Sequence, residues 1–216
     1  TDPCLGEVKA VFNVADAAEC VVTDDQTFQD LVQGDNGAAD AGVVRVQSGG
    51  DLTTTGGWAG IGYNRQAKMI VETGGVANFG GHLWVGLHDG SVGTVDINGG
   101  TVTIADALDL GRNAGAVGLV NVNAGLLQAR YITDTSFSVG SLMDISFGTF
   151  VLEGGYGGTQ KTRIDGVIAS GGIVGFGGNS GLTIEEIDGN THITADADPW
   201  ARTPTWDALV PSAGLN

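Results

Sequence analysis

The sequence VGLHDGSVGTVDINGG, from Val85 to Gly100, decides the fold, because a closely similar stretch, GRNAGAVGLVNVNAG, runs from Gly111 to Gly125. Each stretch ends an alternating apolar run with a pair whose second residue is glycine. Such a pair recurs six times, at residues 49–50, 74–75, 99–100, 124–125, 147–148 and 171–172. The intervals between successive pairs are 25, 25, 25, 23 and 24 residues. A unit of this size buries its apolar face only against its neighbours, so the fixed period predicts a solenoid.

Apolar residues alternate with polar or small ones on both sides of each pair, which predicts strands with one buried face. Four positions before the first residue of each pair stand Arg45, Ile70, Val95, Val120, Met143 and Val167. Three positions after it stand Leu52, Ala77, Val102, Leu127, Phe150 and Val174. In the first repeat, Val44 and Val46 are one position out of register, which suggests a bulge or an edge rung there.

A small polar residue precedes every pair: Ser48, Thr73, Asn98, Asn123, Ser146 and Ser170. Such a residue followed by glycine favours a tight corner, and stacked corners can hydrogen-bond from one repeat to the next. A second glycine column follows Ile61, Val85 and Leu110. Because each repeat of 23–25 residues then holds three strand segments, we predict an all-β fold, a three-faced right-handed parallel β-helix of six to seven rungs.

Three segments are expected along the chain. Residues 1–40 do not fit the repeat, and the capping-box pattern at Thr23–Gln26, followed by Phe28, Leu31 and Val32, predicts a short amphipathic helix that caps the first rung. Residues 41–196 form the β-helix. Residues 197–216 contain Pro199, Pro204 and Pro211, which exclude a central strand, so this segment is either a cap on its own rod or a tail that docks on a neighbour.

Composition excludes several classes of protein. Glycine accounts for 38 of 216 residues without a collagen period, and 42% of the residues are hydrophobic, which argues against disorder. The formal net charge of −16 would repel a phosphate backbone, so we expect no nucleic-acid partner. No apolar stretch approaches the ~20 residues that span a bilayer, so no membrane insertion is expected.

The two cysteines, Cys4 and Cys20, both lie near the N-terminus. They are either free thiols or a disulfide that closes a short loop, and the acidic composition favours the disulfide and an exported protein. A chain that starts Thr1-Asp2-Pro3 suggests a mature form whose signal peptide has been removed. We therefore expect an extracellular or cell-surface location.

The runs 60–64, 85–100 and 111–125 also resemble the β-helical repeats of secreted bacterial surface proteins. These repeats occur in autotransporter-like passengers and large exported repeat proteins. The resemblance implies a right-handed β-helix outside the cell, within the wider pectin-lyase-like architecture. It brings no catalytic motif, because the shared residues belong to the scaffold.

The sequence contains only weak candidates for reactive groups, so no catalytic, cofactor or metal site is assigned. Arg130 beside Asp134, and Lys161 beside Arg163 and Asp165, are the basic residues with acidic neighbours that a polysaccharide lyase would need. Asp96 and Asp144, two rungs apart with Asn121 between them, are the candidate carboxylates of a glycoside hydrolase. His82, His88 and His192 share no column, which argues against a metal site.

The interpretation that fits these columns is a self-assembling structural subunit of a surface filament, sheath or matrix, whose partner is itself. Head-to-tail contact is predicted between two groups of residues: Trp200, Trp206, Leu209 and Val210 at one end, and Phe28 and Leu31 at the other. One alternative is a carbohydrate-active enzyme that uses Arg130 or Lys161. Another is a glycan-binding adhesin module that uses exposed aromatic residues, namely Trp58, Tyr63 and Trp84.

Overall fold

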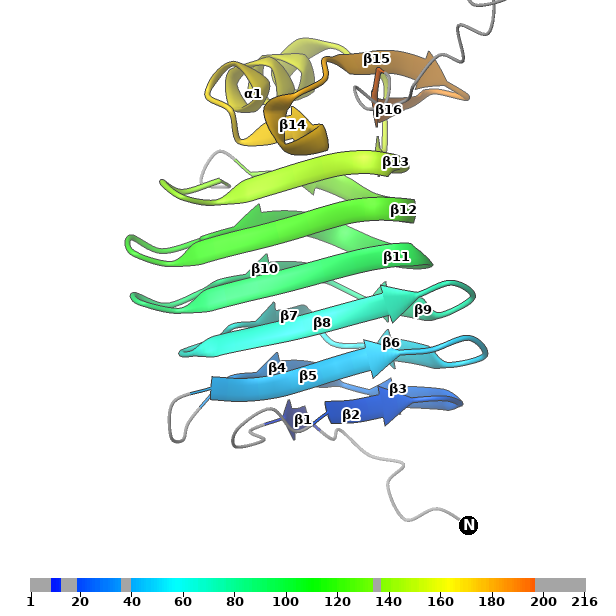
Figure 1. The fold of residues 1–216 in the computed structure, drawn as a ribbon, viewed down its shortest axis with the longest axis vertical. Helices are drawn as coiled ribbons and strands as arrows, with labels where there is room; N and C mark the ends of the chain where they lie inside the picture. Colours follow the sequence, from blue (N-terminus) through cyan, green and yellow to red (C-terminus); the bar gives the residue numbers. More distant parts are fainter. Residues whose placement is uncertain (1–8, 13–18, 36–39, 134–136, 197–216) are drawn as a thin grey trace, which may run out of the picture.

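The computed structural model describes residues 9–12, 19–35, 40–133 and 137–196, and it is a β-solenoid of about five turns with one helix (Figure 1). The all-β solenoid is therefore confirmed, with fewer turns than the six to seven expected. Strands of successive turns pair in parallel, from β1 at one end to β13 near the other.

The strands form three faces. The first face stacks β2 (Glu19–Val22), β5 (Asp40–Val46), β8 (Gln66–Glu72) and the first parts of β11 (Val92–Leu110), β12 (Val117–Ile132) and β13 (Leu142–Leu152). The second stacks β3 (Asp25–Phe28), β6 (Asp51–Thr54), β9 (Val76–Phe79) and later parts of β11, β12 and β13. The third stacks β1 (Lys9–Phe12), β4 (Asp30–Gln33), β7 (Trp58–Ile61), β10 (His82–Val85) and the ends of β11 and β12.

The predicted core column on the second face is confirmed for its first five members. These five pair in register from β6 to β13 and are all buried: Leu52, Ala77, Val102, Leu127 and Phe150. The sixth, Val174, is half-buried in β14 (Ile173–Gly175) and pairs with Asp144 on the first face, so its predicted place in this column is wrong. Stacking equivalent side chains at each turn gives one continuous core that no single repeat could build.

The column predicted on the first face is partly wrong. Met69, not Ile70, lies beside Val95, and Val44, not Arg45, lies beside Met69. The register shifts at the corner of β11, where Asn98 and Gly99 both pair with Glu72. A bulge of this kind moves every residue on one side of it by one position, so the offset seen at Val44 in the sequence extends to β8 as well.

The small polar corner column links one turn to the next, as predicted. Thr73 Oγ1 donates to the Asn98 carbonyl at 3.0 Å, and Asn123 Nδ2 donates to Asn98 Oδ1 at 2.9 Å. These bonds join residues 25 positions apart, so they connect neighbouring turns at the corner rather than residues within one turn.

The predicted N-terminal capping helix is wrong. Residues 25–28 and 30–33 are the strands β3 and β4, and they pair with β6 and β7 as a regular turn of the solenoid. Leu31 is fully buried, so it does not offer the contact surface predicted for it, while Phe28 is half-buried against the core. Pairing with an adjacent strand edge outweighs a local capping pattern, because a short helix has little stability of its own.

The C-terminal end departs from the repeat. Around the sixth pair the chain forms α1 (Gly158–Ala169), β14 (Ile173–Gly175) and a 3-10 turn, η1 (Phe176–Gly178). Val167, predicted as a strand residue, therefore lies in α1. A hairpin of β15 (Leu182–Ile187) and β16 (Asn190–Ala195) follows, and β16 pairs antiparallel with β13. The helix and the hairpin lie over the last turn (Figure 1), so the capping helix stands at the opposite end from the one predicted.

The predicted disulfide is not formed by Cys20. Cys20 lies half-buried in β2 with a free thiol, and burial raises its pKa. Cys4 lies outside the described residues, as do the predicted contact residues Trp200, Trp206, Leu209 and Val210.

Candidate functional site: an aromatic face on the third sheet

Aromatic side chains gather on the outside of the third face. In β10, His82 and Trp84 alternate with Leu83 and Val85, which are buried in the core. In β7, Trp58 precedes the buried Ala59. Because successive residues of a strand point to opposite sides, the ring-bearing residues face away from the core. We call Trp58, Tyr63, His82, Trp84 and His88 the aromatic face; all five are half-buried.

The three aromatic residues predicted to be exposed lie together. The rings of Trp58 and Trp84 stack with centroids 5.2 Å apart and an interplanar angle of 25°. The rings of Trp58 and Tyr63 stack at 5.6 Å and 29°. Since contacting rings are separated by ~3.5 Å, centroids this far apart mean that the rings are displaced sideways by roughly 4 Å. The staircase that results leaves part of each ring uncovered by its neighbour.

A glycine makes room for Tyr63 on the sheet. A Cβ added at Gly60 would lie 3.0 Å from Tyr63 Cδ2, so the phenol ring rests directly over this position of β7. At the other edge of the same ring, His88 packs edge-on with centroids 4.8 Å apart. Asn113 Nδ2 lies 3.4 Å from His88 Nδ1 in the following turn. His88 and Asn113 therefore support the Tyr63 edge of the aromatic face.

The buried carboxylate of Asp109 positions the Arg112 guanidinium beside Trp84, at the end of the staircase. The guanidinium carbon of Arg112 lies 5.4 Å from the centre of the Trp84 ring, and Arg112 Nη1 donates to Asp109 Oδ2 at 2.9 Å. Asp109 is fully buried and also accepts a hydrogen bond from Thr133 Oγ1. Because Thr133 and Arg112 both hydrogen-bond to the Asp109 carboxylate, the carboxylate is held in place. It therefore orients the Arg112 guanidinium over the Trp84 indole, where a cation–π contact is favourable.

Polar groups also line the other edge of the face. His82 Nε2 lies 3.2 Å from Asp106 Oδ2, and the His82 ring stacks on Trp84 with centroids 6.2 Å apart. Asp106 lies in β11, and Tyr131 lies in the neighbouring strand β12. Burial and a hydrogen bond to Asp106 raise the pKa of Tyr131. The aromatic rings are thus bordered by carboxylates and by hydrogen-bonding groups.

Buried polar atoms without a partner concentrate on the third face. Six side-chain polar atoms of the described residues are buried and unpaired: Asp30 Oδ1, Gln33 Oε1, His82 Nδ1, Trp84 Nε1, Ser91 Oγ and Gln160 Nε2. His82 and Trp84 belong to the aromatic face, and Asp30 lies at the start of the adjacent strand β4. A buried donor or acceptor left without any partner costs about 1–3 kcal/mol, so these atoms are places where a further polar partner would be stabilising.

The carboxylates predicted for glycoside hydrolysis are already engaged. Asp96, Asn121 and Asp144 stack in register, and Asn121 Nδ2 donates to Asp96 Oδ1 at 2.7 Å. Lys68 Nζ lies 2.5 Å from Asp96 Oδ2, and Asp144 Oδ1 accepts the Gly177 N–H at 2.8 Å. This arrangement links neighbouring turns and a corner of the cap.

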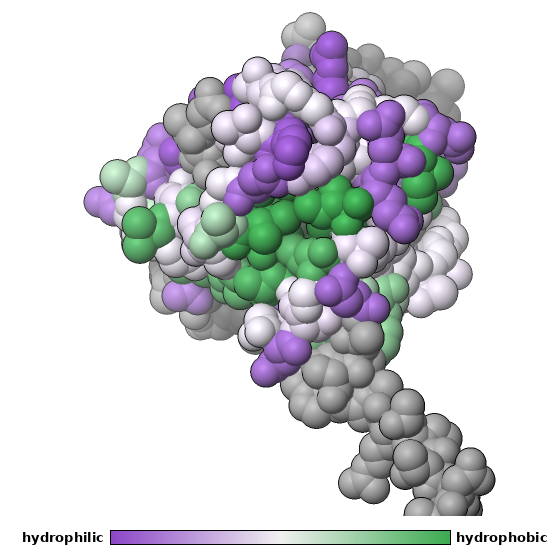
Figure 2. Space-filling view, turned by 90° about the horizontal axis from the view of Figure 1, so that it is seen from above, coloured by the Kyte–Doolittle hydropathy of each residue, from purple (hydrophilic) through white to green (hydrophobic). Residues whose placement is uncertain are grey.

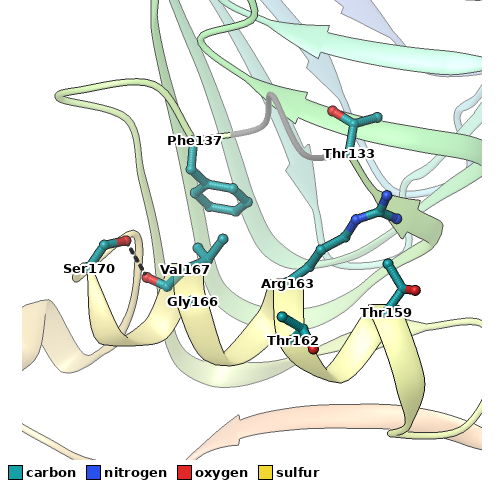
Figure 3. Close-up of a pocket in the computed structure, with 8 residues that line it drawn as sticks. All are labelled: Thr133, Phe137, Thr159, Thr162, Arg163, Gly166, Val167 and Ser170. Atoms are coloured by element: carbon teal, nitrogen blue, oxygen red, sulfur yellow. Dashed lines mark hydrogen bonds between the residues drawn. The ribbon is translucent and has the colours of Figure 1, made fainter.

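The basic residues predicted for a lyase are dispersed. Lys161 forms an ion pair with Asp165 at 2.6 Å on α1. The hydrogen bond from Lys161 is the largest cause of a lowered pKa of the Asp165 carboxyl, and the hydrogen bond from Tyr156 lowers it further. Arg163, on the same helix, borders a cavity of about 350 Å³ together with Phe137 and Val167 (Figure 3). Arg130 is exposed in β12, and Asp134 lies outside the described residues.

The described residues contain no group of three or more His, Cys, Asp or Glu side chains that could hold a metal ion. His192 lies in β16, away from the other two histidines. Among the same residues, no helix has the length and apolar character needed to cross a membrane.

Comparison with models of known protein families, with curated proteins and with solved structures gave no match.

Proposed function

We propose that the protein is an extracellular β-solenoid that binds carbohydrate through the aromatic face. The observation that carries the proposal is the meeting of Trp58, Tyr63 and Trp84 as one half-buried staircase on the side of the rod. The extracellular location rests on the resemblance of the repeats to those of secreted bacterial surface proteins.

The chemistry of the face suits a sugar. A pyranose ring has an apolar C–H face, which packs on aromatic carbon, and a rim of hydroxyl groups, which need hydrogen-bonding partners. The staircase supplies the first, and Arg112, Asp106 and His82 supply the second. Binding sites generally combine apolar and aromatic surface with a few placed polar groups in this way. The charge of −16 disfavours an anionic ligand, so a neutral or amino sugar is the expected class.

Removing the rings of Trp58 and Tyr63 should weaken binding without unfolding the rod. We expect the double variant Trp58→Ala/Tyr63→Ala to bind its glycan at least tenfold more weakly, a loss of about 1.4 kcal/mol or more. The measurement is a screen of neutral and amino-sugar polysaccharides by affinity electrophoresis, followed by calorimetry on any that bind.

The matched control is Tyr156→Ala, which removes an equally half-buried aromatic ring beside α1, away from the aromatic face. Circular dichroism checks that each variant keeps the β-solenoid. Wild-type protein that binds none of the polysaccharides, or a double variant that binds as well as wild type, contradicts the proposal.

A second candidate function, the self-assembling structural subunit, is favoured by the N-terminal end of the rod. On their outer side, β1, β2 and β3 have no partner strand among the described residues. Val11 and Val21 in these strands are 46% and 42% exposed. An open edge with apolar side chains can accept a strand from a second copy, and a head-to-tail contact of this kind would propagate into a filament.

We expect wild-type protein to associate as its concentration rises, and Val21→Lys to reduce this association, because a charge at a strand edge disfavours pairing. Light scattering across a concentration series and negative-stain electron microscopy make the measurement. The control is Val139→Lys, at a residue that is 99% exposed in a turn beside β13. A wild-type protein that stays monomeric throughout the series would exclude this candidate.

A further inference from the structure

The cap leaves one corner of the last turn uncovered. On its outer side, β13 pairs with β14 at residues 143–145 and with β16 at residues 150–152. Between them, residues 146–149 have no partner strand on that side among the described residues. A groove of about 280 Å³ lies at this gap. Its lining residues are Ser146, Phe147, Gly148, Thr149, Phe176, Thr194, Ala195 and Asp196.

The groove has an aromatic wall that the fold holds in place. Phe147 is 70% exposed, and its ring meets Phe176 edge-on with centroids 5.0 Å apart. Phe176 adopts a left-handed backbone with φ of +48°, which is unfavourable for a bulky side chain. The Gly177 N–H bond to Asp144 and the Asn179 side-chain bond to the Phe176 carbonyl fix this turn. Backbone strain that surrounding bonds maintain often marks a binding element.

The direction of β16 leads the chain into this groove. β16 runs antiparallel to β13, with Ile193 opposite Phe150, so each further residue lies closer to the corner at Phe147. Thr194, Ala195 and Asp196 already line the groove, and the described chain stops at Asp196. Trp200 follows four residues later, within ~13 Å of extended chain. Figure 2, which looks onto this end, shows apolar surface gathered near its centre.

We propose that the protein's own C-terminal segment, residues 197–216, docks in the groove and places Trp200 against Phe147. Because the segment is attached at the rim of the groove, its effective concentration there is in the millimolar range, far above that of a second copy in dilute solution. This inference does not depend on carbohydrate binding by the aromatic face.

Limited digestion with trypsin tests the proposal on the intact chain. Arg202 is the only basic residue after Asp196, and it lies two positions after Trp200. The rate of cleavage at Arg202 therefore measures how accessible the segment is near Trp200. We expect slow cleavage at Arg202 in wild type and several-fold faster cleavage in Phe147→Asp and in Trp200→Ala. Val139→Asp, at another exposed apolar residue, should cleave at the wild-type rate. Mass spectrometry of the released C-terminal fragment gives the rates.

Two results would overturn the proposal. Equal cleavage of wild type and Phe147→Asp would mean that the groove does not hold the segment. Protection that disappears on dilution of wild type would mean that a second copy, not the same chain, occupies the groove. Trp206→Ala, which changes the other tryptophan of the segment, should leave the cleavage rate at Arg202 unchanged.

Discussion

The variant Gly86→Ala should lose about 2–5 kcal/mol of unfolding free energy. Gly86 follows β10 with φ of +75°, a left-handed conformation that costs an L-residue about 1–2 kcal/mol. A Cβ at this position would also overlap the carbonyl oxygen of Val117 and lie 2.6 Å from its carbonyl carbon in the turn above. Backbone atoms cannot rotate away, so the stacked turns must separate locally, which adds about 1–3 kcal/mol. Guanidinium unfolding followed by circular dichroism measures the loss.

Gly90→Ala is the matched control for this effect. Gly90 lies in the same turn with φ of +74°, but no atom approaches within 4 Å of the position a Cβ would take. Its substitution should cost only the conformational term of about 1–2 kcal/mol. Equal losses in the two variants would mean that the spacing between turns does not constrain Gly86.

The core columns were predictable because the repeat itself is in the sequence. The column from Leu52 to Phe150 depends only on a period of 23–25 residues and on the alternation within a strand, and both survive in the structure. The bulge at Asn98 and Gly99 could not be predicted, because it is a property of two paired strands. Counting a fixed number of residues back from each glycine pair therefore put Arg45 and Ile70 in the core column, where Val44 and Met69 lie.

The predictions for the two ends of the rod were wrong in opposite ways: strands formed where a helix was predicted, and a helix formed where a strand was predicted. Around Phe28 and Leu31, apolar spacing suited a helix, yet the edges of β6 and β7 were available and strands formed. Around Gly171, a glycine pair matched the repeat, yet α1 formed from the preceding residues. Both segments are short, and for short apolar segments the choice between helix and strand depends on what they pack against.

The aromatic face was partly readable. Trp58, Tyr63 and Trp84 were named as exposed aromatic residues, but nothing in the prediction placed them together. What brings them together is the pairing of β7 with β10, which sets Trp58 beside His82 and Gly60 beside Trp84. The roles of Asp109 and Arg112 could not have been predicted, since a buried carboxylate needs partners from other turns, such as Thr133.

Phe150→Ala should cost about 3–5 kcal/mol, the usual range for removing a fully buried aromatic ring. Phe150 pairs with Leu127 in the turn below and with Ile193 of the cap above. The cavity would therefore open at the junction between the solenoid and its cap. Because each turn of a solenoid is stabilised by its neighbours, we expect the cap to detach before the rest unfolds. Hydrogen exchange should show faster exchange in β15 and β16, and guanidinium unfolding measures the total loss.

Gln128→Ala provides the comparison on the adjacent strand β12. Gln128 is half-buried between the core positions Leu127 and Ala129, so it points away from the core. Its truncation should change the unfolding free energy by about 0.5 kcal/mol or less. If Phe150→Ala lowers stability but leaves exchange in β15 and β16 unchanged, the cap is held by contacts other than this ring. The half-buried apolar residues Leu182 and Ile184 of β15, which pack against the core, would then be the residues to substitute next.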